Sequence, residues 1–254
     1  RLRTVTGVQT CALPIPALDL SAARVPTAQG MPPIQPGDPF SVTDALCRAS
    51  SGARYAVCGH IFGTSARAAY AAMSSLFLQR SAIWAIDSYG ANAPPMQSFR
   101  VEGMDSGLQA AGFTALVRWG EQAHLPAWRE WLAKGFDCDV LLLNSSGNAD
   151  FFDLGMPGKT PPSSCGVPGD IPVLTRPLAL SMVHSFSLQQ PDQRDTIGGR
   201  WLDGGVYAYV GSVHEPYIFA FVAPGAWVSH LVLAETLWVL EAVRSEEHTS
   251  ELQS

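Results

Sequence analysis

The sequence has no two cysteines in the Cys-x-x-Cys spacing that structural zinc sites commonly use. It also lacks Gly-x-Ser-x-Gly, the turn that exposes the nucleophile of α/β-hydrolases. Basic residues number 16 against 22 acidic ones, a formal net charge of −6, and they form no cluster. The first two absences argue against a zinc ribbon and an ordinary α/β-hydrolase. Nucleic-acid binders need a basic patch, so the dispersed basic residues argue against nucleic-acid binding. No motif predicts a metal or cofactor.

Long apolar runs without charge are also missing. The stretch 226–243, "AWVSHLVLAETLWVLEAV", contains His230, Glu235 and Glu241, which favours a buried amphipathic helix over a membrane span. Apart from Cys11 near the start of the chain, four dispersed cysteines fit either free thiols or two disulfides: Cys47, Cys58, Cys138 and Cys165. Neither feature assigns a cellular compartment.

The two ends of the chain are related through their coding DNA. With a permitted choice of codons, the strand complementary to the one encoding "RSEEHTSELQS" (244–254) encodes "VTGVQTCALPI" (5–15). Two independent termini have no reason to share one DNA segment, so we expect 1–15 and 244–254 to be translated sequencing adapter, outside the fold. The remainder is then a fragment, with a Pro-rich lead-in at 16–51 and an α/β domain at 52–243.

Apolar segments alternate with segments of helical period in this domain. Strands are predicted at 53–63, 82–87, 113–119, 139–144, 176–187 and 206–213, and helices at 64–80, 98–112, 125–135 and 194–205. The block Leu141-Leu142-Leu143 shows no polar alternation, as in strands buried on both faces. The pattern predicts a doubly wound, mostly parallel sheet of about six strands with helices on both faces, interrupted by a long loop at 145–176.

Polar residues follow several of these strands, at the edge where open α/β sheets bind ligands. The candidates are His60, His184 and His214 after the first, fifth and sixth strands, Ser185 and Ser187 after the fifth, and Asp150 after the fourth. Each has a structural alternative: a histidine at a strand end can simply be hydrogen-bonded, and serine and aspartate can cap the next segment.

The segment "RDTIGGRWLDGGVYAYVGSVHEPY" (194–217) resembles the caspase-like fold of gingipain-type cysteine peptidases. The order of elements matches over about 138–215, and the fold class over about 53–220. The resemblance implies a nucleophile at the end of "MVHSFS" and a catalytic histidine at the end of "DVLLLNSSGN".

Both chemical positions depart from that family. No cysteine occurs in 177–200, where Ser185 and Ser187 stand, and Asn144 or Asn148 occupies the histidine region. Because asparagine cannot accept a proton and the nucleophile of this class is a thiolate, standard Cys–His proteolysis is not expected.

Three hypotheses follow. The first is a binding or structural module for an unknown small-molecule or peptide ligand. The second is a hydrolase with Ser185 or Ser187 as nucleophile, His184 or His214 as base and Asp150 orienting the base. The third is a Rossmann-like domain that binds a small anion near 59–65.

Overall fold

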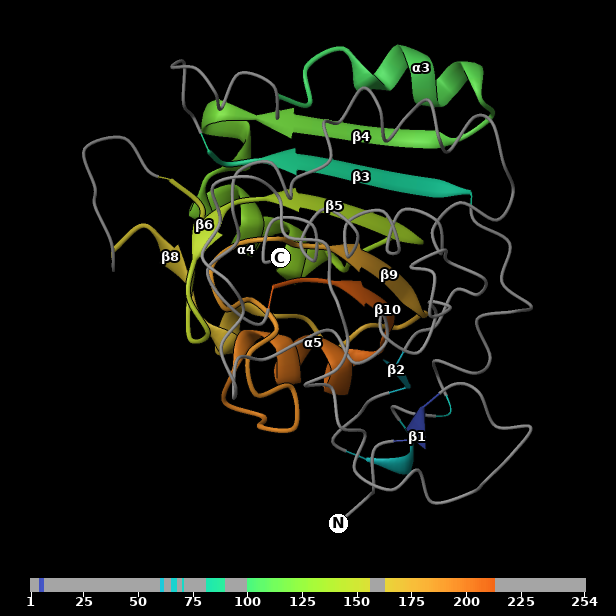
Figure 1. Ribbon diagram of the computed structural model, residues 1–254. Coiled ribbons are helices and arrows are strands. Elements are labelled where there is room, and N and C mark those ends of the chain that lie inside the picture. Colours follow the sequence, from blue (N-terminus) through green and yellow to red (C-terminus); the bar gives the residue numbers. More distant parts are fainter. Residues whose placement is uncertain are drawn as a thin grey trace, which may run out of the picture.

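The computed structural model describes residues 5–6, 60–61, 65–67, 70, 81–89, 100–155 and 163–212. Within them, five strands form a parallel sheet in the order β4-β3-β5-β9-β10, and their arrowheads meet at one edge in Figure 1. The strands are β3 (Ala82–Asp87), β4 (Thr114–Trp119), β5 (Val140–Asn144), β9 (Leu178–Ser181) and β10 (Val206–Val210). The strand order reverses between β3 and β5. The chain passes from β3 to β4 on one side of β3 and then returns to form β5 on the other side.

The predicted α/β class and parallel sheet are confirmed, with five strands in the main sheet of the described residues rather than six. Most of the first expected strand, 53–63, lies outside those residues. Its described part, β2 (His60–Ile61), pairs antiparallel with β1 (Val5–Thr6) in a separate two-stranded sheet. The anion site expected near 59–65 and the segment 244–254 likewise lie largely or wholly outside the described residues.

Three α-helices are described in full: α3 (Met104–Ala110), α4 (Leu125–Lys134) and α5 (Ile197–Gly204). Helix α3 is shorter than the helix predicted at 98–112 and starts six residues later. Gly103 immediately before it has φ +80°, in the left-handed region that glycine tolerates. Helix α5 starts at a Thr196 cap, whose hydroxyl accepts the Gly199 N–H.

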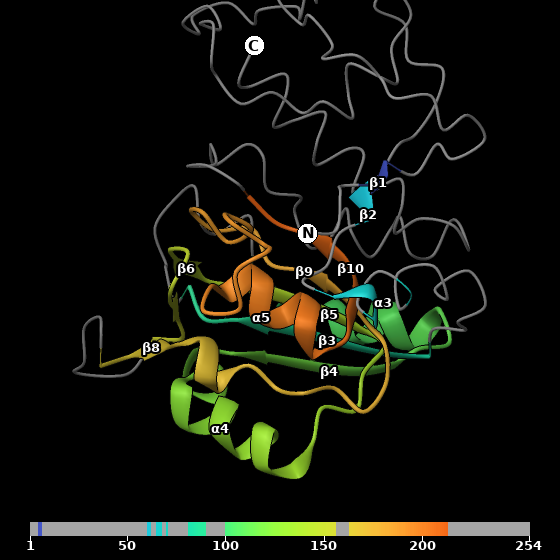
Figure 2. The ribbon, with the colours of Figure 1, turned by 90° about the horizontal axis from the view of Figure 1, so that it is seen from below.

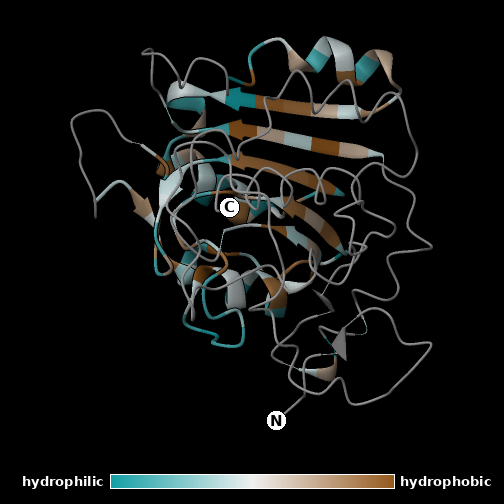
Figure 3. Ribbon diagram, in the orientation of Figure 1, coloured by the Kyte–Doolittle hydropathy of each residue, from teal (hydrophilic) through white to brown (hydrophobic). Residues whose placement is uncertain are grey.

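Side chains of β5 enter two separate hydrophobic clusters. Leu141 and Leu143 pack in one with residues of α4 and α5, and Val140 and Leu142 pack in the other with α3. Since neighbouring residues of a strand point to opposite faces, the two clusters occupy the two faces of the sheet. All of β5 is buried, and it is hydrophobic along most of its length in Figure 3, as the missing polar alternation predicted.

The segment 145–176 is not a plain loop. It contains the short strands β6 (Ser146–Gly147), β7 (Phe152–Asp153) and β8 (Cys165–Gly166), which pair antiparallel, and a 3-10 helix, η5 (Pro168–Asp170). Figures 1 and 2 show β6 and β8 beside the arrowhead edge of the main sheet, with α4 below the sheet in Figure 2. This small sheet therefore lies where a ligand site was expected.

Cys138 and Cys165 are buried free thiols, so the four dispersed cysteines do not form two disulfides. Cys47 and Cys58 lie outside the described residues. Across the ranges that the structure describes, no helix has both the length and the apolar character to cross a membrane. The apolar stretch 226–243 is not among them.

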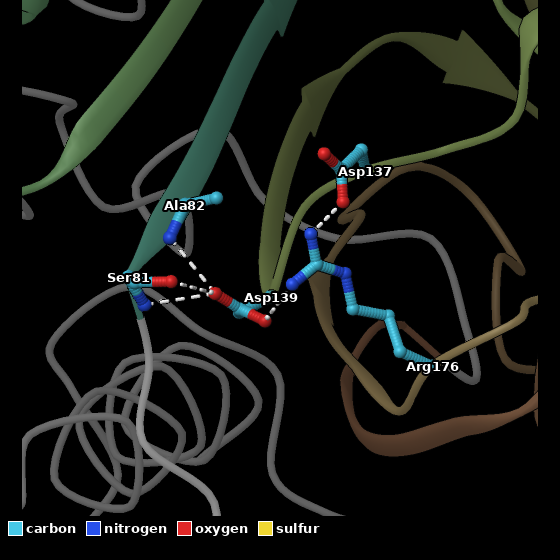
Figure 4. Close-up of polar contacts among 5 residues, drawn as sticks. All are labelled: Ser81, Ala82, Asp137, Asp139 and Arg176. Atoms are coloured by element: carbon cyan, nitrogen blue, oxygen red, sulfur yellow. Dashed lines mark hydrogen bonds and ion pairs between the residues drawn. The ribbon is translucent and has the colours of Figure 1, made fainter.

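Asp139 organises the opposite, amino-terminal edge of the sheet (Figure 4). Its Oδ2 accepts the backbone N–H groups of Ser81 and Ala82, both at 2.8 Å, and the Ser81 hydroxyl at 3.1 Å. Its Oδ1 accepts Arg176 NH1 at 3.1 Å, and the same guanidinium also contacts Asp137. One carboxylate thus ties the starts of β3 and β5 to the segment that leads into β9.

Replacing Asp139 with alanine is expected to lower the free energy of unfolding by about 2–3 kcal/mol, because two N–H donors lose a charged acceptor. Urea unfolding measures the change. The control is Asp137→Ala, which removes a largely exposed partner of the same arginine and should cost less than about 0.5 kcal/mol. Equal costs for the two variants would contradict this role of Asp139.

Candidate functional site

Two groups of polar residues lie at the carboxyl edge of the sheet. The switch-point cluster lies where the strand order reverses between β3 and β5, and it consists of Asp87, Ser88, Asn144 and Asp153. The β5–β9 cluster lies beyond the ends of the next two strands, and it consists of Ser145, Gly147, His184, Ser185 and Ser187.

Ser88 holds the switch-point cluster together. Its N–H donates to the Asn144 carbonyl at 3.0 Å, and its hydroxyl lies 2.9 Å from that carbonyl and 2.8 Å from the Asp153 carbonyl. The Asp153 carboxylate in turn accepts the Gly155 N–H at 2.9 Å and the Ser164 hydroxyl at 2.7 Å. These contacts join β7 to the ends of β3 and β5, largely through backbone carbonyl groups.

Asp87 is the buried acid of the switch-point cluster. Burial raises its pKa from 3.8 to about 6, while the Tyr89 N–H, which donates to Oδ1 at 3.0 Å, works in the opposite direction. The Glu102 carboxylate adds to the rise and Arg100 opposes it. A carboxyl group with this pKa changes charge near neutral pH, which is a property shared by functional and structural buried acids.

His184 is the buried base of the β5–β9 cluster. Burial lowers its pKa from 6.5 to about 4, and the contact with the Ser185 carbonyl offsets part of that change. The ring is therefore neutral at pH 7. Its Nδ1 lies 3.0 Å from the Ser185 carbonyl oxygen, which can only accept, so we assign the proton to Nδ1 and a lone pair to Nε2. Nε2 is buried without a hydrogen-bond partner.

A tight turn follows β9 and positions Ser187. The Ser187 N–H donates to the His184 carbonyl at 3.1 Å, and Phe186 inside the turn has φ +58°, an uncommon value for a residue other than glycine. Ser187 is fully buried, and its hydroxyl accepts the Ser212 N–H at 2.9 Å while its carbonyl accepts the Tyr209 hydroxyl at 3.0 Å. Ser187 thus ties the turn to the end of β10.

Gly147 brings the segment after β5 against His184. A Cβ built on Gly147 would lie 2.7 Å from Nδ1 and Cε1 of His184 and 2.5 Å from the Phe151 carbonyl. Only glycine fits between these groups without a shift, since the Phe151 contact is with backbone. Ser145, two residues earlier, is fully buried, and its hydroxyl has no hydrogen-bond partner.

The candidates from the sequence are only partly brought together. His184, Ser185 and Ser187 share the turn after β9, with Ser185 half-buried. Asp150 is exposed, and its carboxylate contributes to the raised pKa of Cys165, behind burial and the Asp153 carboxylate. His214 and the side chain of His60 lie outside the described residues. The roles assigned to all of these residues stay predictions.

Ser145, Gly147 and the buried state of Asp87 were not singled out from the sequence. Ser145 and Asp87 stand at predicted strand ends, which was the available signal, but many other polar residues share that position. Burial distinguishes them from the other polar residues, together with their hydrogen bonds: Asp87 accepts one and the Ser145 hydroxyl makes none. Both properties depend on which strands are neighbours in the sheet.

Among the described residues, no group of three His, Cys, Asp or Glu side chains is placed to hold a metal ion. A scan against protein-family models, a search of curated proteins and a search of solved structures each found nothing that matches this chain.

Proposed function

We propose that this chain is a caspase-like, doubly wound α/β domain that binds a small-molecule or peptide ligand and does not act as a standard cysteine peptidase. The observation that carries the proposal is the state of the turn after β9. The resemblance implies a nucleophile at this turn, where His184 and Ser187 are buried. The Ser187 hydroxyl accepts a hydrogen bond from the Ser212 N–H.

The described thiols support the same conclusion. A cysteine nucleophile acts as a thiolate, which requires a lowered pKa. Burial raises the pKa of Cys138, next to the start of β5 at the amino edge of the sheet, and it raises the pKa of Cys165 in β8 as well. Neither thiol is ionised at neutral pH, and neither follows the strand that would carry the nucleophile.

A hydrolase with a serine nucleophile is the second candidate, and one observation favours it. A general base must be neutral and must offer a lone pair, and His184 Nε2 does both. Against it, Nε2 makes no hydrogen bond to any serine hydroxyl, and the Ser187 hydroxyl is committed to a backbone N–H.

A fluorophosphonate probe, which reacts with activated serines, separates the two candidates. The full chain, Ser185→Ala and Ser187→Ala are expected to remain unlabelled, since no described serine is hydrogen-bonded to the Nε2 base. Labelling is read by intact mass, with a known serine hydrolase as the positive control. Labelling of the wild type that disappears in either variant would overturn the binding proposal and establish the hydrolase.

A further inference from the structure

Within the described part of the chain, three buried side-chain polar atoms have no hydrogen-bond partner: Ser145 Oγ, His184 Nε2 and Trp201 Nε1. Trp201 belongs to the hydrophobic cluster that α4 and α5 form on one face of the sheet. Leu141 and Leu143 of β5, Leu180 of β9 and Met182, the residue that follows β9, belong to the same cluster. Counted in steps of two, as side chains alternate along a strand, Ser145 and His184 are the next positions of these two series, each past the end of its strand.

The register of the two strands, continued past their last paired residues, points to Ser145 and His184 as neighbours. The last pair is Leu142 of β5 with Ser181 of β9, and Ser145 and His184 stand three residues beyond these partners, past the ends of both strands. Neighbouring strands lie about 4.8 Å apart. The close approach of Gly147 to the His184 ring shows that the two segments are still adjacent beyond the end of the paired region.

The two side chains are complementary in one respect. The Ser145 hydroxyl has a proton to donate and lone pairs to accept, and His184 Nε2 has only a lone pair. Leaving both unpaired in a buried site is unfavourable, because each has lost its hydrogen bonds to water.

We propose that Ser145 Oγ and His184 Nε2 together bind one neutral hydroxyl group, supplied by an internal water or by a ligand alcohol. A hydroxyl donates its proton to Nε2 and accepts the proton of Ser145. An anion is disfavoured because the Nε2 lone pair repels it, and an ammonium group has no lone pair for the Ser145 proton. This hydroxyl site is part of the proposed ligand-binding function and rests on it. Its tests do not depend on labelling by the fluorophosphonate probe.

The change in melting temperature that Ser145→Ala causes relative to the wild type has opposite expected signs with and without the bound hydroxyl. If the hydroxyl is bound, the variant loses its partner and melts about 2–4 °C lower. Should nothing bind there, removal of an unsatisfied buried hydroxyl leaves the melting temperature unchanged or raises it. Ser187→Ala is the matched control, since its buried hydroxyl has a known partner, the Ser212 N–H, and its loss should lower the melting temperature.

Nuclear magnetic resonance identifies the source of the hydroxyl. Cross-relaxation between His184 Hδ2, the ring proton next to Nε2, and water in plain buffer assigns it to water. Cross-peaks to the CH protons of added glycerol, absent in Ser145→Ala, assign it to a ligand alcohol. A melting temperature for Ser145→Ala that is unchanged or raised both in plain buffer and with added glycerol, or the absence of both kinds of cross-peak, overturns the proposal. In that case the chain can still bind ligands elsewhere, and unlabelled serines leave the proposed function standing.

Discussion

Truncation of Trp128 to alanine is expected to lower the free energy of unfolding by about 3–5 kcal/mol, the usual cost of deleting a large buried aromatic side chain. Trp128 in α4 is fully buried, and its ring centroid lies 5.0 Å from that of Phe136, 5.3 Å from Phe152 and 6.2 Å from Trp201. Its indole N–H also donates to the Asp170 carbonyl at 2.7 Å. One side chain therefore joins α4, β7, η5 and α5.

Two variants separate packing from hydrogen bonding in this effect. Trp128→Phe keeps most of the ring contacts and loses the donor to Asp170, so we expect about 1–3 kcal/mol. Trp131→Ala removes a half-buried neighbour in the same helix, which contacts Trp84 and Trp128, and it should cost less than Trp128→Ala. Urea unfolding at low temperature gives all three values, and a cost below about 1 kcal/mol for Trp128→Ala would contradict this packing.

The same residue links the core to the candidate site. Phe152 stands in β7, whose pairing with β6 holds Gly147, and Gly147 packs against His184. Loss of the Trp128–Phe152 contact should therefore loosen the segment that covers the β5–β9 cluster, in addition to destabilising the whole domain.

Strand periodicity predicted most of the main sheet. The expected strands 82–87 and 139–144 differ from β3 and β5 by at most one residue, because burial on both faces of a parallel sheet leaves a plain apolar run. The fifth strand was expected at 176–187, yet β9 ends at Ser181. The chain then enters the turn around Phe186, and nothing in "MVHSFS" signals that its backbone takes a positive φ.

The candidate site was less predictable than the sheet. The sequence placed His184, Ser185 and Ser187 at a strand end, but it could not show that the Ser187 hydroxyl accepts a hydrogen bond from the Ser212 N–H. Similarly, Ser145 becomes notable only through the pairing of β5 with β9, which places Leu142 beside Ser181 and so brings the segments that follow the two strands near each other. The two-residue strands β6, β7 and β8 are too short for any hydrophobic period, so 145–176 appeared as loop.

Two buried groups should give this domain opposing responses to acid. The folded-state pKa of Asp87 is raised, so its contribution to stability is present below about pH 4 and is lost as the pH rises through about 6. The folded-state pKa of His184 is lowered, so its contribution is present above about pH 6.5 and is lost as the pH falls toward about 4. Each change in pKa corresponds to roughly 3 kcal/mol, and between pH 4 and 6 the pH dependences of the two contributions nearly cancel.

Single substitutions should therefore expose slopes of opposite sign. Relative to the wild type, Asp87→Asn is expected to gain about 3 kcal/mol at pH 7 and to lose that advantage as the pH falls to 4, because the asparagine does not ionise. His184→Phe is expected to show the reverse trend, becoming more stable relative to wild type as the pH falls from 6.5 to 4. Urea unfolding at half-unit pH steps measures both differences, and the wild-type curve cancels the background from surface groups.

The double variant provides the internal check. Asp87 and His184 lie in different clusters, so their contributions should add, and Asp87→Asn/His184→Phe should follow the wild-type pH dependence more closely between pH 4 and 6 than either single variant does. Parallel slopes in the two single variants would mean that at least one group titrates with its ordinary pKa and is not buried as the structure places it. Chemical-shift titration of the Asp87 carboxyl carbon and the His184 ring would then identify which one.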